Sequence, residues 1–257
     1  MISVPDGPAA EPEELLGQLQ RRLHVWITEP RSDPGMAWTA ATEGLLTDEE
    51  RARHRRFMRE ADRDLFLSAR VLVRRTLSRY CDIAPAEWTF RRNQFGRPEI
   101  SNRDAPSGLR FNLSHTEGMV ALMVHDVADG GVDVERLGRV TDLPSVARLA
   151  FAGIEQQQLE ALPDAQHQGR FYRLWTLKEA FIKATGRGLS MPLKDFWFSW
   201  SDDGSFTLGC RESIEREPRA WTFTVRQPSA HHVLATAYRS GVGRPVPEVD
   251  LRRVTLT

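Results

Sequence analysis

The chain has 257 residues, of which 40% are hydrophobic and 27% are charged, and its 35 basic residues balance 35 acidic ones. This composition is typical of a soluble globular protein that is long enough for one large domain or two small ones. No apolar run reaches the ~20 residues that a membrane-spanning helix requires. The balanced charge gives no indication of nucleic acid binding.

The N-terminal residues and the cysteines indicate in which cellular compartment the protein is expected. The first residues, MISVPDGPAAEPEELL, are acidic and proline-rich and lack the basic start and apolar stretch of a secretion signal. The two cysteines, Cys81 and Cys210, lie far apart and outside any CxxC spacing. We therefore expect neither a zinc site nor a disulfide framework, and we expect a cytoplasmic protein.

The basic residues are unevenly distributed. Residues 51–110 contain 15 arginines against 7 acidic residues, and such a patch suits phosphates or an acidic protein, although it also suits a solvated helix face. Arginine supplies 32 of the 35 basic residues, and the lysines are Lys178, Lys183 and Lys194. A lysine retained in this background indicates a role that a guanidinium cannot fill.

Hydrophobic periodicity predicts alternating strands and helices along the chain. A short helix is expected near residues 11–23, and Thr47 with Glu50 predicts a capping box that starts a long amphipathic helical region. Further helices are expected at 143–151, 154–162 and 170–185, the last ending at Gly186. The expected strands are 24–28, 88–90, 109–113, 119–125, 132–135, 197–200, 206–208, 221–225 and 233–238.

This order predicts an α+β fold of two similar lobes, because each half runs from a strand through helices to further strands. We expect a flexible lead at residues 1–20, an N-terminal lobe at 21–128, a C-terminal lobe at 129–240 and a poorly ordered tail at 241–257. Ligands usually bind in clefts between such lobes.

The segment Gly131-Val-Asp-Val-Glu135 carries two carboxylates two residues apart. In a strand, Val132 and Val134 would enter the core, while Asp133 and Glu135 would share the opposite surface. Neighbouring carboxylates repel unless a cation lies between them, and Mg²⁺ suits such oxygen ligands. The alternative is the exposed edge of a half-buried strand.

The helix at 170–185 presents an apolar stripe with polar residues beside it. Glu179 and Lys183, four residues apart, would be neighbours, as they also would be in an ordinary surface ion pair. Lys178 projects from the middle of the apolar stripe, so it must extend to solvent or find a buried partner.

Ser114 and His115 are expected in a turn after a strand, where a hydroxyl, an imidazole and free backbone N–H groups could hold a phosphate. A nucleophile and base pair is the competing interpretation, but adjacent residues seldom face each other and no G-x-S-x-G elbow is present. A histidine with satisfied hydrogen bonds in the core or a turn is the third interpretation.

These segments, in this order, resemble the larger, surfactin-type branch of the 4'-phosphopantetheinyl transferase superfamily. Residues 111–116 (FNLSHT) are similar to the family's FN(I/L)SHS segment, residues 131–135 to G(I/V)D(I/V)E, residues 175–183 to WxxKE(A/S)xxK, and residues 95–98 (FGRP) to (Y/F)GKP. With Arg53, Phe57 and residues 72–74, the resemblance extends over residues 45–240.

The resemblance implies a pseudo-dimer of two α+β lobes with the active site in the cleft between them. It implies that the 4'-phosphopantetheine arm of coenzyme A, the substrate, moves to a serine of an acyl or peptidyl carrier protein, leaving adenosine 3',5'-bisphosphate. The implied cofactor is Mg²⁺, with Mn²⁺ as the alternative ion.

Site residues follow from the same resemblance. Asp133, Glu135 and Glu179 would ligate the metal, Glu179 or Glu135 would take the proton from the carrier serine, and Lys183 would contact phosphate and stabilise the leaving group. The coenzyme A-binding residues in the first half would be Arg53, Arg92, Gly96, Arg97, Pro98, Ser114 and His115. The family often has lysine at positions 53 and 97, and here Glu50 occupies the place of a further basic contact expected at the ribose 3'-phosphate.

The expected partners are acidic carrier protein domains of fatty acid, polyketide or nonribosomal peptide synthesis, with no nucleic acid and no membrane. The two lobes predict a monomer. A catalytically silent coenzyme A or nucleotide-binding module is a rival, but all three carboxylates and Lys183 are present. A magnesium-dependent phosphohydrolase is a second rival, which leaves residues 112–115 and 95–98 unexplained.

Overall fold

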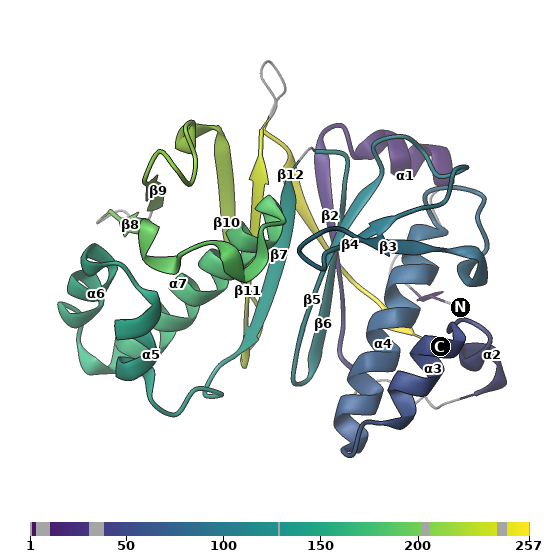
Figure 1. The fold of residues 1–257 in the computed structure, drawn as a ribbon, viewed down its shortest axis with the longest axis horizontal. Helices are drawn as coiled ribbons and strands as arrows, with labels where there is room; N and C mark the ends of the chain where they lie inside the picture. Colours follow the sequence, from purple (N-terminus) through teal and green to yellow (C-terminus); the bar gives the residue numbers. More distant parts are fainter. Residues whose placement is uncertain are drawn as a thin grey trace. The chain divides into compact units, whose positions relative to one another are not determined.

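The computed structural model describes residues 2–3, 11–30, 39–127, 129–201, 206–240 and 246–256. The chain divides into two compact units: residues 1–128 with 245–257 form the N-terminal unit, and residues 129–244 form the C-terminal unit. Each unit combines small sheets with helices (Figure 1), so the predicted α+β class is confirmed. Within the described residues, every helix is too short or too polar to cross a lipid bilayer.

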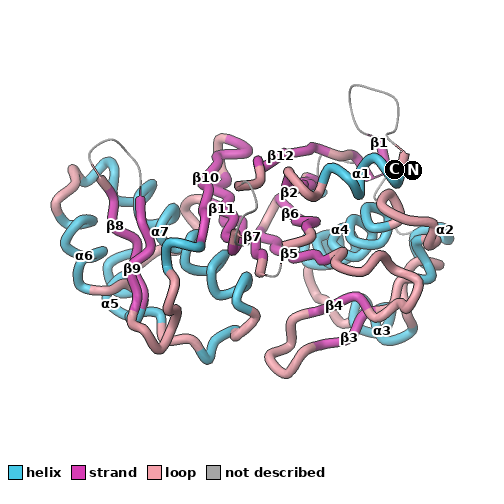
Figure 2. The backbone as a smooth tube through the Cα atoms, turned by 90° about the horizontal axis from the view of Figure 1, so that it is seen from above, coloured by secondary structure: helices cyan, strands magenta, loops and turns pink. Residues whose placement is uncertain are grey.

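The N-terminal unit is built on a four-stranded sheet in the order β12-β2-β6-β5. Its strands are β2 (Arg22–Thr28), β5 (Arg110–Thr116), β6 (Met119–His125) and β12 (Glu248–Arg253). Figure 2 shows a separate hairpin, formed by β3 (Phe90–Arg92) and β4 (Pro98–Ile100). The predicted strand at 88–90 therefore starts later, and Trp88 is instead a buried core residue.

Helices cover this sheet. They are α1 (Pro12–Gln18), α2 (Ala40–Glu43), α3 (Asp48–Arg55) and α4 (Glu60–Leu77), with a 3₁₀ turn, η2, at Pro85–Glu87. The capping box between Thr47 and Glu50 is present at the start of α3. The predicted long helical region is two helices rather than one, and α4 buries its apolar face, including Val71, Leu72 and Leu77, in the core.

Both ends of the chain contribute to this unit. β12 runs parallel to β2, and β13 (Thr255–Leu256) pairs with β1 (Ile2–Ser3). The predicted poorly ordered tail is therefore wrong for residues 248–256. The flexible lead predicted for residues 1–20 is wrong for α1, because Leu15 and Leu19 are buried in the core and hold it in place.

The C-terminal unit centres on a three-stranded antiparallel sheet, β10-β11-β7. The long helix α7 (Asp164–Thr185) packs along it and ends at Gly186, which has a φ of 67° and thus the left-handed conformation that glycine favours. The strands are β7 (Gly130–Arg136), β10 (Trp221–Ser229), β11 (His232–Arg239) and the hairpin of β8 (Phe196–Trp200) and β9 (Phe206–Cys210). The other helices are α5 (Leu143–Ala150), α6 (Gly153–Glu160) and the 3₁₀ turns η3 (Gly188–Ser190), η4 (Leu193–Asp195) and η5 (Pro218–Ala220).

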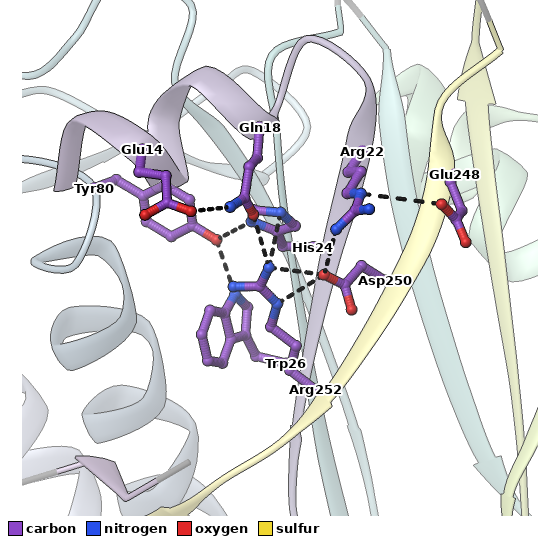
Figure 3. A network of polar contacts seen from close by, with 9 residues as sticks. All are labelled: Glu14, Gln18, Arg22, His24, Trp26, Tyr80, Glu248, Asp250 and Arg252. Carbon is purple, nitrogen blue, oxygen red and sulfur yellow. Dashed lines mark hydrogen bonds and ion pairs between the residues drawn. The ribbon is translucent and has the colours of Figure 1, made fainter. Parts of the chain in front are cut away.

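Within the N-terminal unit, a polar network connects β12 to β2 and to Tyr80, which follows α4 (Figure 3). The Tyr80 hydroxyl accepts a hydrogen bond from Trp26 Nε1 at 2.9 Å and lies 2.7 Å from His24 Nδ1. On the other side of the His24 imidazole, Arg252 Nη2 lies 3.2 Å from His24 Nε2. The same Nη2 donates to Asp250 Oδ2 at 2.7 Å. Because the guanidinium can only donate, Nε2 accepts and Nδ1 carries the proton of a neutral imidazole.

We predict that His24 makes the protein acid-sensitive. Burial, followed by the positive charge of Arg252, lowers the pKa of His24 to about 3. The unfolded chain therefore binds more protons than the folded chain below pH ~6.5, and stability falls as the pH is lowered from there towards 3. Between pH 7 and pH 5 this linkage removes about 2 kcal/mol.

In His24→Gln, the difference between the free energies of unfolding at pH 7 and pH 5, measured with urea, should shrink by that amount. The exposed His231 provides the matched control, because His231→Gln should leave the pH dependence unchanged. An identical pH dependence in His24→Gln and the wild type would contradict the prediction.

Candidate functional site

The carboxylates of β7 lie on the face of the sheet that α7 covers. Gly131, Asp133 and Glu135 are paired with Ala237, Ala235 and Val233 of β11, which belong to the core cluster around α7. Asp133 is only 3% exposed. The sequence interpretation placed both carboxylates on the face opposite Val132 and Val134, and the structure adds that α7 covers this face.

Gly131 explains how strand and helix come so close. A Cβ atom at this position would lie 2.4 Å from Ala180 O and 2.4 Å from Ala184 N, which are backbone atoms of α7. Only glycine permits this approach, since nothing in the helix backbone can move aside cheaply. The contact brings Asp133 and Glu135 beside the part of α7 that carries Glu179 and Lys183.

Lys183 connects the helix to the strand. Its Nζ donates to Asp133 Oδ1 at 2.6 Å, so the two residues that lie 50 positions apart form an ion pair. Glu135 is held separately: Trp175 Nε1 donates to its Oε1 at 3.3 Å, and Arg139 lies 3.7 Å from its Oε2. The segment 175–183 therefore supplies two of the donors that orient the β7 carboxylates.

Three carboxylates share this site. Burial, followed by the charges of Asp133 and Glu135, raises the pKa of Glu179 to about 6, although Lys183 opposes the shift. Burial and Asp133 also raise the pKa of Glu135. Negative charge thus exceeds positive charge here, and a cation would relieve the repulsion.

A metal ion fits the chemistry of this donor set. Within the described residues, no group of three or more His, Cys, Asp or Glu side chains has the arrangement of a finished metal site. Mg²⁺ does not require one, because it commonly takes one or two carboxylates and completes its octahedron with water and substrate phosphate.

Lys178 makes its contacts away from the β7 carboxylates and has a buried partner, which is one of the two alternatives that the sequence left open. Its Nζ lies 2.8 Å from Glu155 Oε2 and donates to the carbonyl oxygens of Leu193 and Phe196 at 2.9 and 2.7 Å. All three ammonium donors are thereby used. Lys178 and Glu155 join α7, α6 and the start of β8, which fixes the helix that carries Glu179.

A second group of site residues lies in the N-terminal unit, around a cavity of about 530 Å³ that we call the arginine pocket. The β3–β4 hairpin, the strand β5 and the helices α3 and α4 all contribute to it. Its basic side chains are Arg53, Arg70, Arg74, Arg91, Arg92 and His115. Such a wall suits a phosphate group.

The residues predicted to bind coenzyme A lie at two neighbouring cavities and at the hairpin turn. Arg53, Arg92, Pro98 and His115 line the arginine pocket. Arg97 lines a neighbouring cavity of about 250 Å³, to which Pro98 also contributes. Gly96 forms the hairpin turn with a φ of 85°, and its carbonyl oxygen accepts a hydrogen bond from Arg92 Nη1 at 3.1 Å.

The predicted turn at Ser114 and His115 is wrong. Both residues belong to β5, where they pair with Ala121 and Val120 of β6, so they lie in a sheet strand and not in a turn. Side chains alternate along the strand. His115 is exposed at the pocket, whereas Ser114 is 4% exposed and faces away from it.

Sequence reasoning missed Arg70 and Arg74. They lie one turn apart on α4, and both pair with Glu50 across the pocket wall. The i, i+4 spacing of two arginines beside the apolar residues of α4 was the available signal, but an Arg-rich segment offers many such pairs.

Comparisons with known proteins place the sequence in a family. Residues 130–237 match the family model described as the 4'-phosphopantetheinyl transferase superfamily, and residues 32–126 match 4'-phosphopantetheinyl transferase, N-terminal. The 4'-phosphopantetheinyl transferase HetI of Nostoc sp. is 36% identical over 67% of this chain and 72% of its own length. The 4'-phosphopantetheinyl transferase Sfp of Bacillus subtilis is 31% identical over 66% of this chain and 73% of its own length.

Among solved structures, a holo-(acyl-carrier-protein) synthase from Bacillus anthracis aligns with 45% of this chain and 98% of its own, at 17% identity and a TM-score of 0.38. The family follows from the sequence matches. The chain belongs to the 4'-phosphopantetheinyl transferase superfamily, and within it to the Sfp-type branch. It is therefore an enzyme of the phosphopantetheinyl transferase class.

We predict that Gly131→Ala disrupts the contact between β7 and α7. The added methyl group must displace helix backbone, which should cost about 1–3 kcal/mol of stability and reduce activity. Gly169→Ala on the same helix is the control: a Cβ there meets nothing within 4 Å, so it should stabilise the protein by roughly 0.5–1 kcal/mol. Urea denaturation measures both, and equal effects of the two substitutions would refute the packing argument.

Glu155 should be essential for stability. Glu155→Ala leaves the Lys178 ammonium buried without its counter-ion, at an expected cost of about 3–5 kcal/mol in the free energy of unfolding. Glu160 lies on the same helix and is exposed, so Glu160→Ala should change stability by less than about 0.5 kcal/mol. Indistinguishable unfolding midpoints for the two variants would show that the buried pair has no such role.

Proposed function

We propose that this enzyme transfers the 4'-phosphopantetheine arm of coenzyme A to a serine of an apo carrier protein. The products are the holo-carrier protein and adenosine 3',5'-bisphosphate. The convergence of Asp133, Glu135, Glu179 and Lys183 on one side of β7 supports this activity most directly, because phosphoryl transfer depends on positioning and on neutralisation of charge.

In the proposed reaction, the serine oxygen forms a bond to the β-phosphorus of coenzyme A, and the bond from that phosphorus to the bridging oxygen breaks. Glu179 takes the serine proton, a role that its place beside Asp133 and Lys183 allows. Lys183, oriented by Asp133, stabilises the charge that moves onto the leaving phosphate.

We also propose that Asp133, Glu135 and Glu179 supply the one or two carboxylate ligands that Mg²⁺ takes, with Mn²⁺ as the alternative ion. When bound, the ion would neutralise the coenzyme A diphosphate, which is the chemistry that a divalent cation supplies in phosphoryl transfer. Burial is the larger cause of the raised pKa values of Glu135 and Glu179, but the neighbouring charge of Asp133 also raises both, and a cation would remove that part of the shift.

The phosphate contacts of the N-terminal unit complete the proposal. Arg53, Arg92 and His115 in the arginine pocket, with Arg97 beside it, would bind coenzyme A, and the backbone of 96–98 would pack near the adenine. Ser114 receives no support, because it faces away from the pocket. The Arg-rich α3 and α4 would attract acidic carrier domains, and we propose a monomer that acts in the cytoplasm.

A silent coenzyme A-binding module and a magnesium-dependent phosphohydrolase are the rival activities. One assay separates them: apo-carrier protein, coenzyme A and Mg²⁺ are incubated together, and the carrier is weighed by mass spectrometry. The transferase adds one phosphopantetheine arm to the carrier, a phosphohydrolase releases phosphate, and a silent module does neither. An unmodified carrier in this assay, across a panel of apo-carriers, would refute the proposal.

Variants of the carboxylates and the lysine test the roles. Asp133→Asn and Glu179→Gln should each reduce transfer at least a hundredfold, by analogy with the loss of a group that stabilises transition-state charge. Lys183→Ala should lower kcat more than it raises KM, because its contact strengthens on the leaving group. The control is Glu160→Gln, an exposed residue of α6 that should retain wild-type kinetics. Wild-type transfer by Glu179→Gln would rule out its role as base.

A further inference from the structure

Glu50 places a carboxylate in the wall of the arginine pocket. Its carboxylate closes the α3 capping box by accepting the Thr47 N–H at 3.1 Å. The same carboxylate lies 3.0 Å from Arg70 Nε and accepts a hydrogen bond from Arg74 Nη2 at 2.9 Å. One carboxylate is thus held between two guanidinium groups of the next helix.

The pocket keeps an excess of positive charge despite Glu50. Arg53 and Arg92 also line it, and neither forms an ion pair within the described residues. Burial lowers the pKa of Arg70, and the neighbouring charges of Arg74, Arg53 and Arg92 lower it further, whereas Glu50 raises it. Glu49 also lines the pocket but is exposed to solvent, where its charge is screened. A dianion would therefore find a site that is still short of negative charge.

Phe66 restricts the positions of two of these side chains. The Arg70 guanidinium carbon lies 4.7 Å from the ring centroid, and that of Arg53 lies 5.5 Å from it. Phe66 itself is buried, with 7% exposure. A guanidinium held by a carboxylate and an aromatic ring loses less freedom when it binds a ligand, so its contact with a phosphate is stronger.

Coenzyme A offers two anionic groups to such a pocket. The proposed function assigns the diphosphate to Lys183 and the metal. The remaining group is the 3'-phosphate monoester, whose charge approaches −2 near pH 7 because the second pKa of a phosphate monoester is ~6. A fork of N–H donors matches the oxygens of that group.

We propose that Arg70 binds the 3'-phosphate of coenzyme A, that Glu50 holds Arg70 in position for this contact, and that the pair makes the enzyme selective for coenzyme A over dephospho-coenzyme A. Arg70 is the binding residue and Glu50 is a positioning residue. This inference rests on the proposed function, since it takes coenzyme A as the ligand.

Binding of adenosine 3',5'-bisphosphate and of adenosine 5'-monophosphate, measured by calorimetry, tests Arg70 without any transfer reaction. Arg70→Gln should weaken binding of the bisphosphate about tenfold to a hundredfold, the value of a hydrogen bond to a charged group, and leave binding of the monophosphate unchanged. In kinetics, KM for coenzyme A should rise with kcat unchanged. The kinetics with dephospho-coenzyme A should stay at the wild-type values, which also shows that the variant is folded.

Glu50→Gln distinguishes positioning from simple repulsion. If Glu50 only repels the phosphate, removing its charge must tighten binding of the bisphosphate. If Glu50 positions Arg70, the substitution weakens binding of the bisphosphate although it makes the pocket more positive. We expect the affinity to fall about threefold to tenfold, which is less than in Arg70→Gln, because the hydrogen bond from Arg70 to the phosphate is still possible. The matched control is Arg103→Gln, an exposed arginine of the same unit outside the pocket, which should leave the ratio of the two affinities unchanged.

The outcomes separate this inference from the proposed function. An unchanged affinity ratio in Arg70→Gln, an equal loss for both nucleotides, or tighter binding by Glu50→Gln would overturn the inference even if the wild type transfers the arm normally. A wild type that binds the bisphosphate selectively but modifies no carrier protein would overturn the proposed function and leave the role of Arg70 in place.

Discussion

The close packing of β7 against α7 at Gly131 is the constraint on which the C-terminal site depends. Without a side chain at this position, the strand lies directly against the backbone at Ala180 and Ala184. The neighbouring residues of the two elements are then brought together, so Asp133 meets Lys183 at 2.6 Å. Phosphoryl transfer depends largely on positioning and charge, so the absence of a side chain at position 131 bears directly on the proposed site.

Both groups of site residues contain a buried or partly buried ion pair. Glu155 of α6 pairs with Lys178 of α7, and Glu50, in the wall of the arginine pocket, pairs with Arg70 and Arg74 of α4. Each pair is partly or fully buried, where an unpaired charge would be costly. In both cases a structural ion pair lies next to the residues assigned to the substrate, and it fixes the helix that carries them.

The elements and the family could be predicted from the sequence because their signals are local. The Thr47 capping box, the left-handed Gly186 and the alternation around Asp133 all depend on residues a few positions apart. For Lys178 the sequence left two alternatives, extension to solvent or a buried partner, and the structure shows the buried partner, Glu155. The turn expected at Ser114 and His115 was wrong because β6 extends the ladder over them, and no local pattern reveals how far a partner strand continues.

The sequence by itself determined the α+β class, the motif residues and the family, since these depend on residue type and on spacing along the chain. Only the tertiary structure decided that α7 covers the β7 carboxylates, that residues 248–253 complete the N-terminal sheet, and that Glu50 is paired with Arg70. Each of these joins segments from different parts of the chain, and charge or periodicity within one segment cannot specify which distant segment will lie against it.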